Sequence, residues 1–147
     1  MKTNKLLKIF GLFMMAAFFF TAPQNVSAQS SDPDAPTRLT DGTIVGESTG
    51  GVSDKKTYYF SFDVKPGTLT MTTDMDPVKG TGGGVIYWTY LTTRFKQLRY
   101  NAWAAQGSPT RKMDDAKITI KRKIILKLEV EGQMSYKIKF SGSALTK

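Results

Sequence analysis

The strongest constraint on the fold is an alternation of apolar and polar side chains in the second half of the chain. From Lys117 to Val130 the apolar residues of one parity are Ile118, Ile120, Ile124, Leu126, Leu128 and Val130. A period of two residues is typical of a strand with one buried and one solvated face. No window of helical length shows a convincing apolar stripe with a period of 3.6 residues. The chain is therefore predicted to be all-β.

Arg122 falls on the apolar side of this alternation, so a bulge, a bend or a break between two strands is expected there. Glu131-Gly132-Gln133 is expected to form a turn. After it, Tyr136, Ile138 and Phe140 are expected to face inward on a last strand, with lysines between them facing outward.

The segment Tyr58–Val64 alternates in the same way and is followed by Lys65-Pro66-Gly67. Pro presets φ and Gly accepts a positive φ, which favours a type II turn. Leu69 and Met71 resume the alternation, so a hairpin-like unit is predicted here. The next break is expected from Asp74 to Gly84, as a long flexible loop. Short strands separated by Gly, Pro and Asp turns indicate an antiparallel β-sandwich, most simply of jelly-roll type.

The first 28 residues have the order of parts expected of a cleavable signal peptide. Three lysines precede an apolar run from Ile9 to Phe20, and Val26-Ser27-Ala28 supplies a cleavage site. An uncleaved membrane anchor is the alternative, but the run is short for one. We expect export to the periplasm or the exterior, with no transmembrane anchor after processing. Residues 29–36 are predicted to be a flexible arm and residues 37–147 a single β-sandwich domain.

The chain has no histidine and no cysteine. Their absence removes the commonest general base near neutral pH, the Ser/His and Cys/His nucleophile systems and ordinary zinc sites. It also leaves the exported domain without disulfides, so the fold depends on packing alone. These absences argue against an enzyme.

Charge is distributed unevenly along the chain. Residues 29–76 carry four basic and eight acidic residues, whereas residues 77–147 carry fourteen basic and four acidic residues. Alternation places five lysines on the outward parity of the last strands, where paired strands would give a basic face: Lys121, Lys123, Lys127, Lys137 and Lys139. Such a face suits an acidic polysaccharide or envelope polymer, or it serves only solubility. Export and the lack of interleaved aromatic residues argue against nucleic acid as a partner.

Two aromatic clusters are candidates for a ligand platform, because exposed Trp and Tyr rings can stack on the apolar faces of sugars. The residues are Tyr87, Trp88, Tyr90, Tyr100 and Trp103. Tyr87 is opposite in parity to Trp88 and Tyr90, so in a one-sided sheet one set must be exposed. Core packing is the alternative for most of these rings.

Asp74 and Asp76 precede a glycine-rich segment and are weak candidates for a Ca²⁺ site. Calcium takes six to eight oxygen ligands, and no third acid lies nearby in the sequence. Turn formation by the two aspartates is therefore the simpler interpretation, and no cofactor is expected.

The stretch from Tyr58 to Met71 resembles the opening hairpin of bacterial pre-peptidase C-terminal domains. The ending Gly132-Gln133-Met134-Ser135-Tyr136-Lys137-Ile138-Lys139-Phe140 resembles their final Gly-x-x-x-Tyr strand. The resemblance covers the first and last thirds of the domain, whereas in the middle Asp76 leads into Pro77 and the glycines. It implies a secreted, non-catalytic jelly-roll β-sandwich of the kind appended to enzymes as a binding or secretion-associated module.

Three hypotheses about function follow. The first is an exported, non-catalytic binding module for a glycan or another cell-envelope polymer. The second, suggested by the basic face, is a structural or interaction protein whose sheet face or edge pairs with an envelope or secreted partner protein. The third is a small hydrolase that uses two carboxylates, although spacing nominates no pair of acids.

Overall fold

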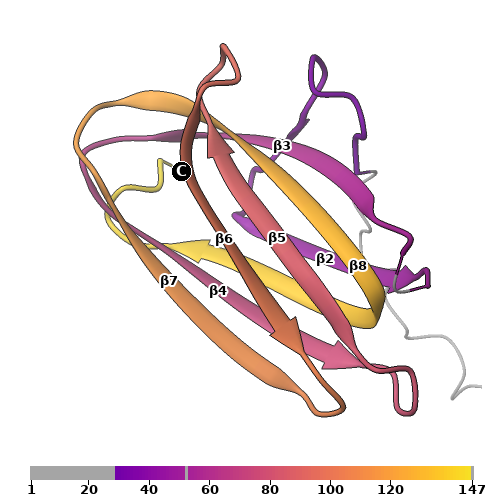
Figure 1. The fold of residues 1–147 in the computed structure, drawn as a ribbon. Helices are drawn as coiled ribbons and strands as arrows, with labels where there is room; N and C mark the ends of the chain where they lie inside the picture. The colour runs from indigo at the N-terminus through magenta and orange to yellow at the C-terminus, as the bar shows by residue number, and fades with distance from the viewer. Residues whose placement is uncertain (1–28, 52, 147) are drawn as a thin grey trace, which may run out of the picture.

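The described residues form eight strands, whose arrangement Figure 1 shows. The structure is a computed structural model and describes residues 29–51 and 53–146. No helix occurs in this described part of the chain, so the all-β prediction is confirmed. The strands are β1 (Thr37–Arg38), β2 (Thr43–Thr49), β3 (Lys56–Val64), β4 (Gly67–Pro77), β5 (Gly84–Leu91), β6 (Gln97–Ala105), β7 (Thr110–Ile118) and β8 (Arg122–Ser141).

The strands form two layers that share β8. Sheet A has the order β1-β3-β8-β5-β6, and sheet B has the order β2-β8-β4-β7. All these pairs are antiparallel except β1 with β3, which run parallel. The predicted antiparallel β-sandwich is confirmed with that exception. The chain passes between the sheets at most of its connections, which is the winding expected of a jelly roll.

Strand β8 belongs to both sheets because it bends at Gly132. Its first part pairs with β3 and β5, and its second part pairs with β2 and β4. Figure 1 shows the orange first arm and the yellow second arm meeting at this bend. Gly132 has a φ of 88°, a conformation that favours glycine. The turn predicted between two strands is therefore wrong: it is a bend within one strand.

The bend packs directly against the glycines that precede β5. A Cβ atom at Gly132 would lie 2.4 Å from the carbonyl oxygen of Gly83. The amide of Gln133 donates a hydrogen bond to that same oxygen, at 3.2 Å. The buried Ser48 hydroxyl donates to the carbonyl of Gly132 at 2.7 Å. Gly83 and Gly84, predicted to belong to a flexible loop, thus form part of the support for the bend.

Two further boundaries differ from the prediction, and a third agrees with one of the predicted alternatives. Strands β3 and β4 lie in different sheets, so Lys65-Pro66-Gly67 connects the two layers and no hairpin forms. Strand β4 continues through Asp74 to Pro77, because β7 and β8 pair with it on both sides. The irregularity expected at Arg122 is a break between strands β7 and β8.

The core lies between the two sheets and includes the inward residues of β8. Alternation along this strand continues across the bend, so both arms send the same parity inward. The largest fully buried side chains are Trp88, Phe60, Leu69, Met71, Met75, Ile86, Ile124, Leu126, Leu128, Met134, Ile138 and Val64. The outward parity of β8 therefore lies on the outer faces of both sheets.

The predicted signal peptide, residues 1–28, lies outside the described residues. Within the described chain, no helix is long and apolar enough to cross a membrane. The first residues of the predicted flexible arm contact the sandwich. Ser30 forms an isolated bridge with Tyr59, and the Gln29 side chain donates to the carbonyl of Val45 at 3.0 Å.

We expect Gly132→Ala to destabilise the domain far more than Gly80→Ala. Both glycines have positive φ, so each substitution costs about 1–2 kcal/mol of left-handed strain. A Cβ at Gly80 meets open space, whereas one at Gly132 collides with backbone, which adds about 1–3 kcal/mol. Urea unfolding followed by tryptophan fluorescence measures the difference. Equal midpoints for the two variants would show that the bend does not depend on close packing.

Candidate functional site

The structure buries two of the five predicted platform residues. Trp88 is 0% exposed and Tyr90 is 2% exposed, and their rings pack on each other with centroids 4.9 Å apart. Burial, and secondarily the charge of Asp114, raise the pKa of the Tyr90 hydroxyl. The prediction that these two rings form a binding platform is wrong, because their parity on β5 faces the core.

Trp103 also faces inward, on β6 at the edge of sheet A. Its register partner is the fully buried Ile86, and its ring packs edge-on against Trp88 at 5.8 Å. It is half-buried because, among the residues described, no strand of sheet A lies beyond β6. Trp103 therefore extends the core toward the rim of the sandwich.

Tyr87 and Tyr100 lie on the outer face of sheet A, so one aromatic set is exposed, as parity predicts. The Tyr87 hydroxyl donates to a carboxylate oxygen of Glu131 at 3.3 Å. The Lys55 ammonium lies 4.2 Å from the centre of its ring. Burial, and then the charge of Glu131, raise the pKa of Tyr87. Tyr100 is the more open of the two rings.

The five predicted lysines do not form one face. Lys123 and Lys127 lie on the outer side of sheet A, with Lys121 just before β8. Lys137 and Lys139 lie on the outer side of sheet B. The bend at Gly132 sends the two arms of β8 into different sheets. The prediction of a single basic face is therefore wrong.

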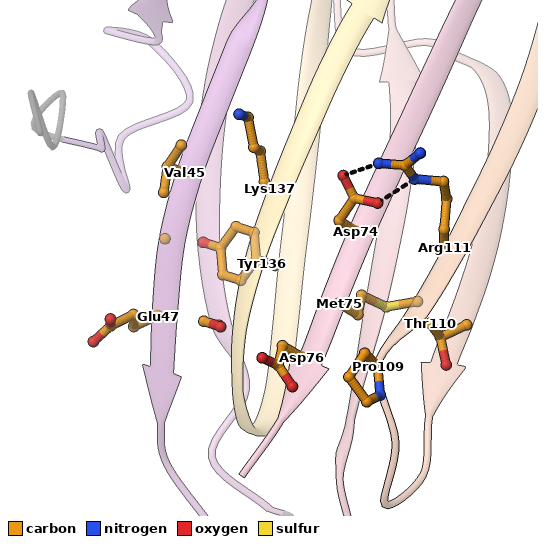
Figure 2. Close-up of a pocket in the computed structure, with 12 residues that line it drawn as sticks. Val45, Glu47, Asp74, Met75, Asp76, Pro109, Thr110, Arg111, Tyr136 and Lys137 are labelled. Carbon is orange, nitrogen blue, oxygen red and sulfur yellow. Dashed lines mark hydrogen bonds and ion pairs between the residues drawn. The ribbon is translucent and has the colours of Figure 1, made fainter.

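Asp74, Asp76 and Lys137 come together on the outer face of sheet B, where they line an open groove of about 560 Å³. Figure 2 shows this groove with side chains from β2, β8, β4 and β7 around it. One cross-strand row contains Val45, Lys137, Asp74 and Arg111, each beside the next. The groove thus crosses the strands of sheet B.

The next cross-strand row explains why the surface is hollow. Glu47 on β2, Ser135 on β8 and Asp76 on β4 are register partners. Serine is the smallest side chain of this row, and it lies between two longer acids. Because neighbouring strands are about 4.8 Å apart, the two carboxylates stand on either side of a gap centred on Ser135.

The groove carries charges of both signs. Asp74 and Arg111 form a two-point pair, with the second Arg111 nitrogen at 3.2 Å from the carboxylate. Hydrogen bonding from Arg111 lowers the pKa of Asp74 below its ordinary value. Glu47 and Asp76 have no salt bridge within the described residues. Two acids therefore remain open to a ligand beside a fixed ion pair.

A second hollow of about 430 Å³ extends the groove toward the connection after β4. It shares Glu47, Asp76 and Ser135 with the first and adds Val78 and Lys79. The two hollows are therefore neighbours on sheet B, because these three residues line both.

Sequence reasoning missed Glu47, Ser135, Thr110 and Arg111. They come from three separate strands, β2, β8 and β7, and only strand order and register bring these strands together. The one signal in the sequence that could have identified Ser135 is that it has the same outward parity as Lys137 on the last strand. Of the two weak calcium candidates, Asp74 forms an ion pair with Arg111 and Asp76 lines the groove. In the described residues no group of three or more acids, histidines or cysteines could hold a metal ion.

No protein-family model matches the chain, and no curated protein matches it. Among solved structures it is similar to one described as "CBM4 structure and function", with a TM-score of 0.45 and 9% identity, over 71% of this chain and 74% of the other. It is also similar to an arabinose-bound α-L-arabinofuranosidase, with a TM-score of 0.41 and 12% identity, over 71% of this chain but only 22% of the other.

The pre-peptidase C-terminal domain of a collagenase from Bacillus anthracis is a further similar structure. Its TM-score is 0.40 at 18% identity, and the match covers 76% of this chain and 100% of that domain. It is the kind of domain that the stretch from Tyr58 to Met71 resembles in sequence. These likenesses concern the β-sandwich fold, and they leave the ligand open.

The two tryptophans are expected to report different environments. Trp103→Phe leaves only Trp88, which is fully buried, so emission should shift to shorter wavelength and acrylamide should quench it weakly. Trp88→Phe leaves the half-buried Trp103, whose emission should lie at longer wavelength with stronger quenching. Fluorescence spectra of the two variants test this assignment. Strong acrylamide quenching of the Trp103→Phe variant would show instead that Trp88 is exposed to solvent.

Proposed function

We propose that this chain is an exported, non-catalytic binding module that holds a neutral polysaccharide of the cell envelope along the groove of sheet B. The observation that carries the proposal is the open groove across four strands, with the neighbouring second hollow, lined by charged and polar side chains together with Val45, Met75 and Pro109. Its larger part, about 560 Å³, lies within the range of about 300–1,000 Å³ typical of ligand sites.

The polar groups of the groove suit a ligand rich in hydroxyls. Carboxylates accept hydrogen bonds from hydroxyl groups, and guanidinium and ammonium groups donate to hydroxyl oxygens. Glu47 and Asp76 supply acceptors that no salt bridge within the described residues occupies. Arg111 and Lys137 supply donors on the adjacent row. A chain of sugar rings lying across the strands would meet both kinds of group in turn.

The balance of charge favours a neutral polymer over an acidic one. The groove contains Glu47, Asp74 and Asp76 against Arg111, Lys137 and Lys79. An acidic polymer is attracted by a surface whose charges are mainly positive. In this groove three acidic residues balance three basic ones. The lysines that suggested an acidic partner are divided between two sheets.

Several features support a binding function without catalysis. The chain has no histidine and no cysteine. A glycosidase acid needs a raised pKa, whereas the pKa of Asp74 is lowered by Arg111. Hydrogen bonding to hydroxyls requires no metal ion, and we propose that the module works without a cofactor. The hydrolase hypothesis therefore gains no support from the groove.

Export and the choice of partner rest on separate features. The first 28 residues supply the secretory signal on which we base export. Export also argues against nucleic acid as the ligand. The hypothesis of a protein partner was based on a single basic face, and the division of that face removes its motivation.

Ser135→Tyr should abolish polysaccharide binding without unfolding the domain. The side chain points outward at the centre of the groove, so a ring there fills the space that the sugar needs. We expect at least about a tenfold loss of affinity, or roughly 1.4 kcal/mol. Ser141→Tyr is the matched control, because Ser141 is also outward on β8 but lies outside the groove.

Binding is measured by affinity electrophoresis in gels containing dextran, xylan, mixed-linkage β-glucan or polygalacturonate. Retardation by a neutral polymer that Ser135→Tyr removes and Ser141→Tyr retains supports the proposal. Retardation by polygalacturonate alone would overturn the preference for neutral chains. Release of reducing ends from any of these polymers by the wild-type chain would overturn the non-catalytic assignment.

A further inference from the structure

Three exposed apolar side chains lie at one end of the sandwich, away from the groove. Phe95 and Leu98 come from the β5–β6 connection and the start of β6, and Ile120 comes from the β7–β8 connection. Their exposed fractions are 42%, 41% and 52%. Figure 1 shows both connections at the upper end of the molecule. None of these three side chains belongs to the buried core.

A cavity of about 250 Å³ is lined by residues of both segments. Leu98 and Arg99 from β6 line it together with Thr119 from the β7–β8 connection and Arg122 at the start of β8. Its lining includes the core residue Ile124. The start of β6 and the β7–β8 connection are therefore neighbours, with an opening between them.

The same two segments are strongly basic. Residues 92–99 and 116–123 contain no acidic residue and seven basic ones: Arg94, Lys96, Arg99, Lys117, Lys121, Arg122 and Lys123. Arg99 is paired with Asp114 at 2.6 Å. The other six form no salt bridge within the described chain. Asp63, the register partner of Lys123, is bound instead to Arg38.

Phe95 has an unusual backbone. Its φ is 58°, and it is the one residue other than glycine with a positive φ in the described residues. This conformation is costly for a bulky side chain. The turn itself needs no phenyl ring, since it is closed by hydrogen bonds from the Phe95 amide to Thr92 and from the Thr92 amide to Lys96. An exposed ring at a strained position is the kind of outlier that points to function.

We propose that this basic and apolar end, formed by residues 92–99 and 116–123, docks onto the surface of a membrane that contains anionic lipids. Phe95, Leu98 and Ile120 enter the boundary between head groups and acyl chains, and the unpaired cations contact the lipid phosphates. Exposed apolar side chains on the same basic segments favour a lipid surface over a soluble polyanion, which has no apolar layer for them to enter. This surface is separate from the groove of sheet B.

The test uses the chain from Gln29 to Lys147, which contains every strand described above. Its sedimentation with vesicles of phosphatidylcholine is compared with that for an equal mixture of phosphatidylcholine and phosphatidylglycerol. We expect binding to the anionic vesicles alone, and weaker binding as salt is raised. Lys121→Gln and Lys123→Gln should each weaken it roughly fivefold, as expected for one cation at an anionic surface.

Phe95→Gly separates a role in binding from a role in folding. Glycine suits the positive φ at this position, so the variant should unfold at the same or a higher urea concentration. Its vesicle binding should nevertheless fall at least fivefold. Met113→Ala is the matched control, because it removes a more exposed apolar side chain from β7, away from this end, and its vesicle binding should equal that of the wild type.

Equal binding by Phe95→Gly and the wild type would overturn the proposal, as would equal binding to both kinds of vesicle. Dextran sulfate that binds as tightly as the anionic vesicles, with no loss in Phe95→Gly, would identify a general polyanion site instead. Ser135→Tyr should bind vesicles like the wild type, so failure of this proposal is distinguishable from failure of polysaccharide binding.

Discussion

The packing of the β8 bend onto Gly83 and Gly84 is the contact on which the rest of the architecture depends. A single strand of 20 residues supplies the inner pairing partner of β3, β5, β2 and β4. It can do so only if it turns from one sheet into the other at Gly132. The absence of side chains at both Gly132 and Gly84 lets the two backbones approach this closely, and the Ser48 hydroxyl donates a hydrogen bond to the buried carbonyl of Gly132.

The bend also decides which outward residues become neighbours. Because alternation persists through it, one parity of β8 fills the core and the other covers two opposite outer faces. Lys127 and Glu129 consequently join Tyr87 on sheet A, whereas Ser135 and Lys137 join Asp74 on sheet B. Two surfaces of different chemistry are thus built from one strand. The groove of mixed charge belongs to sheet B alone.

The two proposed surfaces differ in how they would hold their partners. The groove offers fixed polar groups, including the two-point Asp74–Arg111 pair, to a ligand that must be matched hydroxyl by hydroxyl. The basic and apolar end, residues 92–99 and 116–123, offers unpaired cations together with exposed apolar side chains. This combination suits the boundary layer of a membrane better than one defined ligand. A domain with both could lie on an anionic membrane and hold a polymer chain alongside it.

Local pattern was enough to determine that this chain forms strands, which residues of each strand share a face, and that histidine and cysteine chemistry is absent. Parity alone separated Tyr87 from Trp88 and Tyr90, because side chains alternate in any strand. Parity does not say which of two faces is buried, and it does not say which strands are neighbours. Trp88 is buried because its face of β5 meets sheet B, and the five lysines are divided because β8 changes sheets. The groove of Glu47, Ser135 and Asp76 likewise exists only through register between strands far apart in the sequence, which is a long-range property that no local pattern encodes.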